Sequence, residues 1–182
     1  MICVDTNIVC YRYMASPFSA AADAAWAKDA DWIVPILWRS EFRNALTGSI
    51  RRRSLTVEEA IAIANLAEAM LDRKEFTVST SAVLQLVSRS KCSAYDCEFV
   101  ALAHANGVRL LTVDREILHD FPEVAISLKR FVRDRGSVAT PDASTGNRYV
   151  IAGDTPAATV SALWLTKMLL RPPAKKLPEP TD

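Results

Sequence analysis

Short apolar runs alternate with segments of helical pattern along the first 135 residues of this chain. A continuous apolar run is typical of a strand buried on both faces, whereas a strand with one wet face alternates apolar and polar residues. This alternation predicts an α/β fold with a mostly parallel sheet flanked by helices on both faces. We expect four to five strands, at residues 2–5, 31–35, 108–113 and 124–128, with a short strand or an extended connector at 76–79.

Helices are predicted between these strands from the spacing of apolar residues and from capping residues. The serine–proline pair at 16–17 predicts a helix start with proline at the first helical position. Thr56 with Glu59, and Ser93 with Asp96, have the spacing of a capping box, in which each side chain of the pair bonds the other's backbone N–H. The expected helical segments are residues 6–14, 18–29, 36–53, 56–73, 80–87 and 93–106, with a short helix after 114.

The chain is predicted to divide near residue 135. Residues 1–135 form one expected domain, whereas the following residues are rich in Ser, Thr, Ala, Gly and Pro, as linkers are. Residues 136–182 are therefore expected to be a linker and an extension with one short apolar helix, too small to form a core alone. No apolar stretch approaches the roughly 20 residues that a bilayer requires, and the amino terminus lacks a signal-peptide pattern. We expect a cytoplasmic protein with no membrane span.

Composition limits the functions to consider. The formal net charge is +1, so affinity for RNA would have to come from a local basic face or from metal ions. The four cysteines form no C-x-x-C pair and have no zinc-finger spacing to a histidine. We therefore expect Cys3, Cys10, Cys92 and Cys97 to be reduced residues in or near the core.

Four acidic residues stand out by their positions. Asp5 and Asp114 each end a predicted strand, and in parallel sheets the ligand crevice lies beyond the carboxyl ends of the strands. Glu41 and Asp96 lie on predicted helices that are otherwise apolar on one face. Carboxylates gathered in one crevice repel each other, and Mg²⁺ or Mn²⁺ relieves that repulsion because these ions prefer oxygen ligands. Such a site suits metal-assisted hydrolysis of a phosphodiester.

Each acid also has a purely structural interpretation. Asp5 and Asp114 are suited to capping the helices that follow them, and Asp96 is favoured in the first turn of its helix by the cap and the dipole. Glu41 is equally consistent with a solvated position at the edge of its helix. The joint order of the four acids, rather than any one of them, favours a shared site.

The segments that contain these acids resemble the PIN-domain family in order and spacing. Within that family the greatest likeness is to the VapC-type toxins of bacterial toxin–antitoxin pairs. The resemblance covers about residues 1–133 and is carried by four segments: VDTNI at 4–8, SEFRNAL at 40–46, YDCEFVALA at 95–103 and LTVDR at 111–115.

The resemblance implies an endoribonuclease that depends on Mg²⁺ or Mn²⁺, with the same four acids as metal ligands and catalytic groups. It implies that Thr6, Asn7 and Thr112 orient carboxylates or water. It further implies a homodimer, inhibited by a cognate antitoxin whose carboxyl-terminal segment enters the active-site groove. The extension after residue 135 lies outside the resemblance.

Basic residues near the acids suggest contacts with RNA. Arg43 lies two residues from Glu41, and Arg115 directly follows Asp114, so both are candidates for phosphate contacts. The three arginines at 51–53 suit either RNA or the carboxyl end of a helix, whose dipole favours positive charge.

Two other functions are weighed against the nuclease. A haloacid-dehalogenase-like phosphatase also has an aspartate after its first strand, but Asn7 stands where its second aspartate is required. A catalytically silent PIN module would bind RNA or a protein without cutting it. Retention of all four acids argues against that module.

Overall fold

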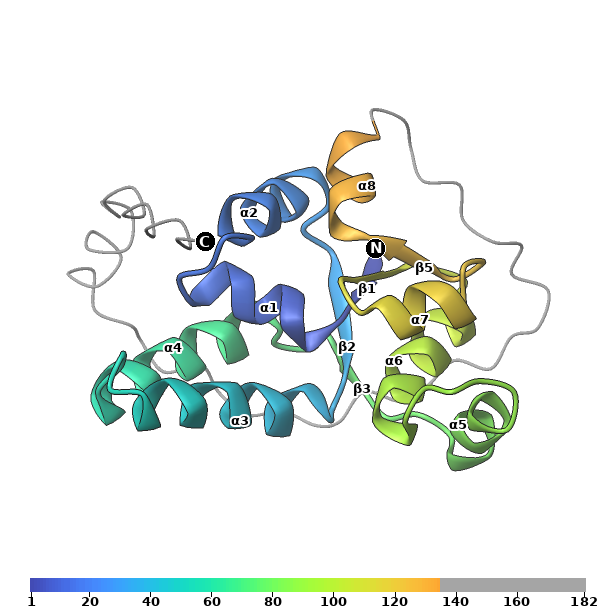
Figure 1. Ribbon diagram of the computed structural model, residues 1–182, viewed down its shortest axis with the longest axis horizontal. Helices are drawn as coiled ribbons and strands as arrows, with labels where there is room; N and C mark the ends of the chain where they lie inside the picture. The colour runs from blue at the N-terminus through green and yellow to red at the C-terminus, as the bar shows by residue number, and fades with distance from the viewer. Residues whose placement is uncertain (135–182) are drawn as a thin grey trace, which may run out of the picture.

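The computed structural model describes residues 1–134, so the predicted extension at 136–182 lies outside the described residues. Its centre is a five-stranded sheet in the order β3-β2-β1-β4-β5, with every neighbouring pair parallel (Figure 1). The predicted parallel α/β architecture is therefore confirmed. The strands are β1 (Ile2–Val4), β2 (Trp32–Pro35), β3 (Glu75–Phe76), β4 (Leu110–Thr112) and β5 (Ala125–Ser127).

The central strands lie in the middle of the sheet because their sequences are continuously apolar. All residues of β1, β2 and β4 are buried, as expected for strands covered on both faces. In the register of the sheet, Cys3 of β1 lies between Ile33 of β2 and Leu110 of β4. The strands are shorter than predicted because the flanking residues turn away into loops and helix caps.

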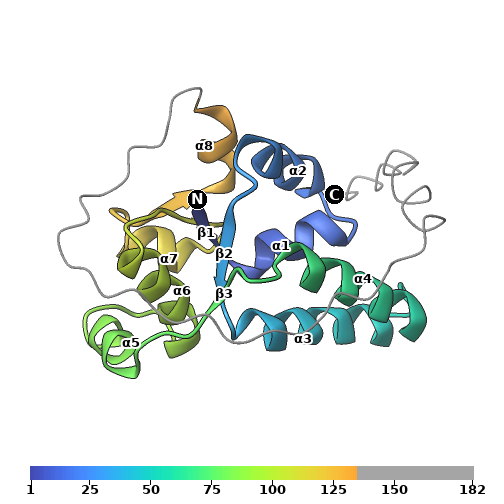
Figure 2. The same cartoon turned by 180° about the vertical axis from the view of Figure 1, so that it is seen from behind.

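Helices cover both faces of this sheet. Helix α6 packs against β1, β2 and β4, whereas α1 contacts β4 from the opposite side, and α2 packs between α1 and α8 (Figures 1 and 2). Helix α3 packs between α1 and α4. The helices are α1 (Thr6–Tyr13), α2 (Ser19–Lys28), α3 (Trp38–Arg51), α4 (Val57–Met70), α5 (Thr80–Val87), α6 (Ala94–Ala105), α7 (Arg115–Asp120) and α8 (Leu128–Arg133).

Both predicted capping boxes are present. The Thr56 hydroxyl accepts a hydrogen bond from the backbone N–H of Glu59, and the Glu59 carboxylate accepts one from the backbone N–H of Thr56. Ser93 and Asp96 make the same reciprocal pair at the start of α6. These bonds satisfy backbone donors that the first helical turn leaves without partners.

Two predicted element boundaries are wrong. Helix α2 begins at Ser19, not at the serine–proline pair, because Ser16 and Ser19 use their hydroxyls to fix a turn before the helix. The last strand ends at Ser127 rather than at Leu128, because the Ser127 hydroxyl accepts from the backbone N–H of Arg130 and caps α8. Helix α8 was not predicted.

The cysteine prediction is confirmed, since Cys3, Cys10, Cys92 and Cys97 are all buried and free of disulfides. Among residues 1–134, no helix is long and apolar enough to cross a membrane.

We expect Thr56→Ala to lower the free energy of unfolding by about 1 kcal/mol, because it removes one half of a capping box. The measurement is urea denaturation followed by circular dichroism. Thr77→Ala is the matched control, since Thr77 is exposed and caps no helix. Equal stabilities of the two variants would show that the box contributes nothing measurable.

Candidate active site

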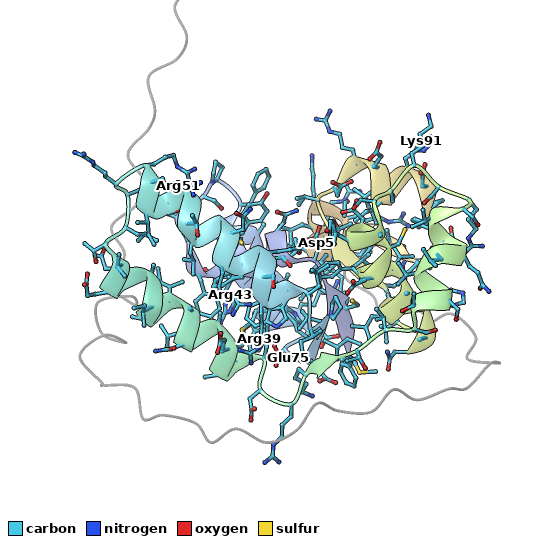
Figure 3. The ribbon with its side chains drawn as sticks, turned by 90° about the horizontal axis from the view of Figure 1, so that it is seen from below. Asp5, Arg39, Arg43, Arg51, Glu75 and Lys91 are labelled. Atoms are coloured by element: carbon cyan, nitrogen blue, oxygen red, sulfur yellow. The ribbon has the colours of Figure 1, made fainter. Side chains whose placement is uncertain are left out.

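The candidate site lies where the strand order of the sheet reverses. From β1 the chain adds β2 and β3 on one side, and β4 and β5 lie on the other. Ligand crevices of open α/β sheets form outside the carboxyl ends of the strands at such a reversal. Asp5 follows the end of β1, and Asp114 lies two residues beyond β4. Figure 3 shows Asp5 between α3 on one side and the helices around α6 on the other.

Asp5 is the buried anchor of this site, with 6% of its surface exposed. Its Oδ2 accepts a hydrogen bond of 2.6 Å from the Thr112 hydroxyl, which is fully buried. The backbone and side-chain nitrogens of Asn7 both donate to Asp5 at 3.3 Å. Thr112 Oγ1 in turn accepts from the backbone N–H of Asp114 at 3.0 Å. One threonine therefore links the ends of β1 and β4 and the two aspartates that follow them.

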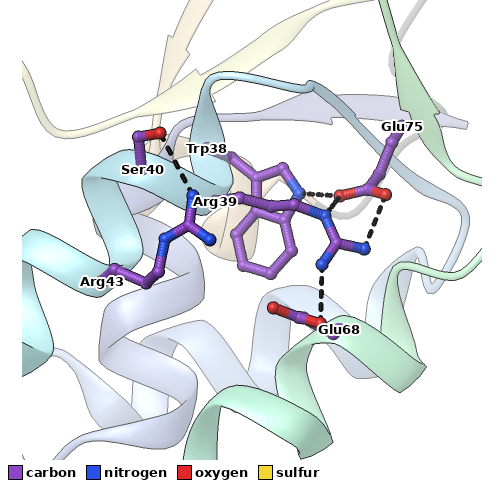
Figure 4. A network of polar contacts seen from close by, with 6 residues as sticks. All are labelled: Trp38, Arg39, Ser40, Arg43, Glu68 and Glu75. Atoms are coloured by element: carbon purple, nitrogen blue, oxygen red, sulfur yellow. Dashed lines mark hydrogen bonds and ion pairs between the residues drawn. The ribbon is translucent and has the colours of Figure 1, made fainter.

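Glu41 is brought to the site by the start of α3. The Thr6 hydroxyl donates to Glu41 Oε2 at 2.5 Å, which joins α3 to the first turn of α1. The neighbouring residue Arg39 holds this end of α3 in place (Figure 4). Its guanidinium donates to both carboxylate oxygens of Glu75 at 2.6 and 2.9 Å and pairs with Glu68 at 2.6 Å. Because Glu75 lies on β3 and Glu68 on α4, Arg39 fastens α3 to two other elements.

Asp96 and Asp114 both act as helix-capping groups, as their structural interpretation predicted. Asp96 Oδ2 accepts from the backbone N–H and the hydroxyl of Ser93. Asp114 Oδ1 accepts from the backbone N–H groups of Glu116 and Ile117. Capping uses one oxygen of each carboxylate, and the other oxygen has no hydrogen bond within residues 1–134. Structural and functional roles are therefore compatible in these two residues.

The charges of the four acids act on one another. Burial raises the pKa of Asp5, against hydrogen bonds from Thr112 and Asn7 that lower it, and the charge of Asp114 raises it further. Burial also raises the pKa of Glu41, the Thr6 hydroxyl lowers it, and the charges of Asp5, Asp96 and Glu98 raise it. The ends of β1 and β4 and the starts of α3 and α6 thus share one electrostatic environment.

This negative charge is not balanced by the protein. Within residues 1–134, none of the four predicted acids forms an ion pair with a lysine, arginine or histidine. Glu41 Oε1 also has no hydrogen bond there. A set of carboxylate oxygens with lone pairs available and no cationic partner is chemically suited to a hard divalent cation.

A complete metal cage is not preformed. In the described part of the chain, no group of three or more Asp, Glu, His or Cys side chains is arranged to hold a metal ion. Mg²⁺ is often bound through one or two carboxylates, with waters and substrate phosphate filling its other positions. The donor set therefore fits a Mg²⁺-type ion through the chemistry of its oxygens.

Glu98 is a residue that the sequence reasoning missed. It lies on α6, it is half-buried, and its charge acts on Glu41. Its position in an otherwise apolar helical run could have identified it, because a glutamate is rarely half-buried without a role. Both arginines predicted to contact RNA are exposed: Arg43 lies on α3 and donates to Ser40 at 3.3 Å, and Arg115 lies in the first turn of α7.

Comparison with known families agrees with this fold. The family model for the PIN domain matches residues 2–126, which is most of the chain. The chain therefore belongs to the PIN-domain family, whose members are generally nucleases. Membership of the PIN-domain family replaces the interpretation of the chain as a dehalogenase-like phosphatase, which the sequence analysis considered.

A solved structure shares the fold. The crystal structure of PAE2754 from Pyrobaculum aerophilum is similar with a TM-score of 0.58 and 21% sequence identity, over 72% of this chain and 85% of that chain. At this identity the similarity supports the fold alone. A search of the curated proteins finds no match.

The raised pKa of Glu41 predicts how Glu41→Gln changes stability with pH. A carboxyl whose pKa is raised on folding stabilises the protein below its unfolded pKa, and that stability is lost as pH rises through the folded pKa. Without divalent cations, the glutamine variant should therefore be more stable than the wild type at pH 7, and this advantage should vanish in acid, below the ordinary glutamate pKa of 4.5.

Urea denaturation across pH 3.5–7.5, a range set by carboxyl titration, measures this difference. Glu123→Gln, which changes an exposed glutamate, is the control. A Glu41→Gln variant less stable than the wild type at pH 7 would contradict the assignment of a destabilising charge to Glu41.

Proposed function

We propose that this protein is a metal-dependent endoribonuclease that hydrolyses phosphodiester bonds of RNA, with Asp5, Glu41, Asp96 and Asp114 as its acidic centre. One observation carries the proposal: these carboxylates share one electrostatic environment at the reversal of the sheet, with no cationic side chain of residues 1–134 paired to them. Members of the PIN-domain family are generally nucleases, which supports a catalytic role for these carboxylates.

The acids would hold Mg²⁺ or Mn²⁺ through their available oxygens. When bound, such a cation stabilises charge on the phosphodiester under attack and makes water a better nucleophile. The protein's own polar groups would fix the carboxylates. Thr112 and Asn7 hold the two oxygens of Asp5, and Thr6 holds one oxygen of Glu41, which leaves the other free.

Arginines at the rim would hold the RNA. The net charge of +1 provides no general attraction, so local cations are needed near an acidic centre that repels phosphate. Arg43 lies two residues after Glu41, and Arg115 directly follows Asp114. Both arginines are exposed and form no ion pair within residues 1–134. Arg51, exposed at the end of α3, would extend the same basic face.

We further propose that the nuclease is the toxin of a toxin–antitoxin pair and acts in the cytoplasm as a homodimer. Support comes from the resemblance of its four acid-containing segments to VapC-type toxins. The partner would be an antitoxin whose carboxyl-terminal segment enters the acidic groove and so blocks access of RNA.

We expect purified protein to cut cellular RNA into discrete fragments with Mg²⁺ or Mn²⁺ and to stop when a chelator is added. Asp5→Asn and Asp96→Asn should each lower the rate by on the order of 10²-fold or more, because they weaken a site whose cation supplies several kcal/mol of charge stabilisation. Glu123→Gln should cut at the wild-type rate. Gel electrophoresis with sequencing of fragment ends provides the rates and the cleavage sites.

The outcomes separate the proposal from its alternative. Equal cleavage by the wild type and the aspartate variants would indicate a contaminating nuclease and overturn the site. RNA binding without cleavage, together with no heat of metal binding by calorimetry, would establish the catalytically silent module instead.

Thr112 offers a test of how the acids are held. Thr112→Val keeps the shape of the side chain but removes the hydroxyl that joins Asp5 to the backbone of Asp114. We expect the affinity for Mn²⁺ to fall about 10- to 100-fold, as for other groups that orient metal ligands. Calorimetric titration measures it, and Thr112→Ser, which retains a hydroxyl, should restore most of the affinity. Unchanged Mn²⁺ affinity in the valine variant would show that this hydroxyl does not orient a ligand.

A further inference from the structure

Two aromatic rings pack together where α1 is followed by α2, with Phe18 exposed and Tyr11 half-buried. The ring centroids of Tyr11 and Phe18 are 4.9 Å apart, and their planes are inclined by 36°. Phe18 is 47% exposed, although it is an entirely apolar ring. The Tyr11 hydroxyl has no hydrogen-bond partner within residues 1–134. The exposed part of this ring is therefore available to a ligand.

The turn that carries Phe18 is firmly built. The Ser16 hydroxyl accepts from the backbone N–H of Phe18 at 3.1 Å, and the Ser19 hydroxyl accepts from the backbone N–H of Ser16 at the same distance. The Ser19 hydroxyl also donates to the carbonyl of Met14. The Phe18 ring is therefore presented on a fixed turn, and its position is set before any ligand arrives.

The two helices behind the turn are also fastened to each other. Arg12 of α1 pairs with Asp23 of α2 at 2.8 Å, and its guanidinium lies over the ring of Trp26 at 4.8 Å from the centroid. This contact holds the aromatic pair relative to α1, the helix that Asp5 caps.

Tyr11 lies near the acidic centre, and Phe18 packs beside it. Asp5 caps α1, and Tyr11 is six residues further along, about 9 Å of helix. The two side chains interact electrostatically, because the charge of Asp5 adds to burial in raising the pKa of Tyr11. A strand of RNA with one phosphate at the carboxylates would therefore pass close to these rings.

We propose that Tyr11 and Phe18 form a stacking surface for an unpaired nucleobase next to the phosphate that is cut. The inference rests on the proposed function and adds to it a base-stacking subsite formed by these two rings. Proteins recognise unpaired bases by stacking them on aromatic side chains, and every base has a face suited to this. A duplex hides these faces within its own stack, so the rings favour a loop, a bulge or an end.

Binding of short fluorescent RNA to the full chain tests the proposal, in an Asp5→Asn background that blocks cleavage and with Mg²⁺ present. Phe18→Ala should weaken binding of oligouridine about 5- to 150-fold, the usual effect of losing one stacked base. The slope of log affinity against log salt should not change, because no phosphate contact is removed. Leu84→Ala is the matched control, since Leu84 is an apolar residue 58% exposed on α5.

Three comparisons distinguish stacking from other effects. An abasic oligomer with the same ribose–phosphate backbone should bind Phe18→Ala and its parent equally, because it has no base to stack. Phe18→Leu retains an apolar side chain without a ring and should weaken oligouridine binding, whereas Phe18→Tyr and Tyr11→Phe should preserve it. Duplex RNA should be insensitive to Phe18→Ala.

The proposal is overturned if Phe18→Ala binds oligouridine as Leu84→Ala does, if it weakens the abasic oligomer to the same degree, or if the parent binds no single-stranded RNA. A change of oligomeric state in Phe18→Ala with unchanged RNA affinity, measured by sedimentation, would assign the rings to a protein contact. Failure of the proposed nuclease function would give a different result: the wild type would cut no RNA, whether or not Phe18→Ala changes RNA binding.

Discussion

The hydrogen bond from the Thr112 hydroxyl to Asp5 joins the two strands on which the whole arrangement depends. It links the carboxyl ends of β1 and β4, at the point where the order of the sheet reverses. The same hydroxyl accepts from the backbone of Asp114 and so fixes the start of α7. Burial opposes ionisation of Asp5, and these donors offset part of that cost. The fold therefore keeps the Asp5 carboxyl group in a buried position, where hydrogen bonds from the protein replace part of its lost hydration.

Helix starts explain how several acids are tolerated close together. Asp5 and Asp114 are the cap residues of α1 and α7, and Asp96 is in the first turn of α6. The positive end of each helix dipole and its unpaired backbone N–H groups stabilise a carboxylate at these positions. Capping and the proposed metal binding do not compete, because capping occupies one oxygen of Asp96 and of Asp114. Glu41 lacks such a cap and depends on Thr6 and on the Arg39 network behind it.

An acidic centre that acts on RNA has to attract a polyanion against its own charge. A divalent cation reduces the local repulsion, and Arg43 and Arg115 would supply charge at the rim. Both contributions weaken as salt rises. A stacking surface at Tyr11 and Phe18 would add affinity that salt does not screen, and it would select unpaired bases rather than any phosphate chain. Together these features would give the proposed enzyme three separate contributions to RNA binding: a cation at the carboxylates, arginines at the rim and aromatic rings at the α1–α2 turn.

The sequence by itself determined the parallel α/β class, both capping boxes and the burial of all four cysteines, because these depend on local patterns of apolar and capping residues. It also placed Asp5 and Asp114 at one edge, since parallel strands share the direction of their ends. Only the tertiary structure decided the rest. The charge of Glu98 on Glu41, the Arg39 contacts and the pairing of Tyr11 with Phe18 join residues whose proximity depends on how helices pack. No periodicity along the chain encodes those distances, because helix packing is set by side chains that are remote in sequence.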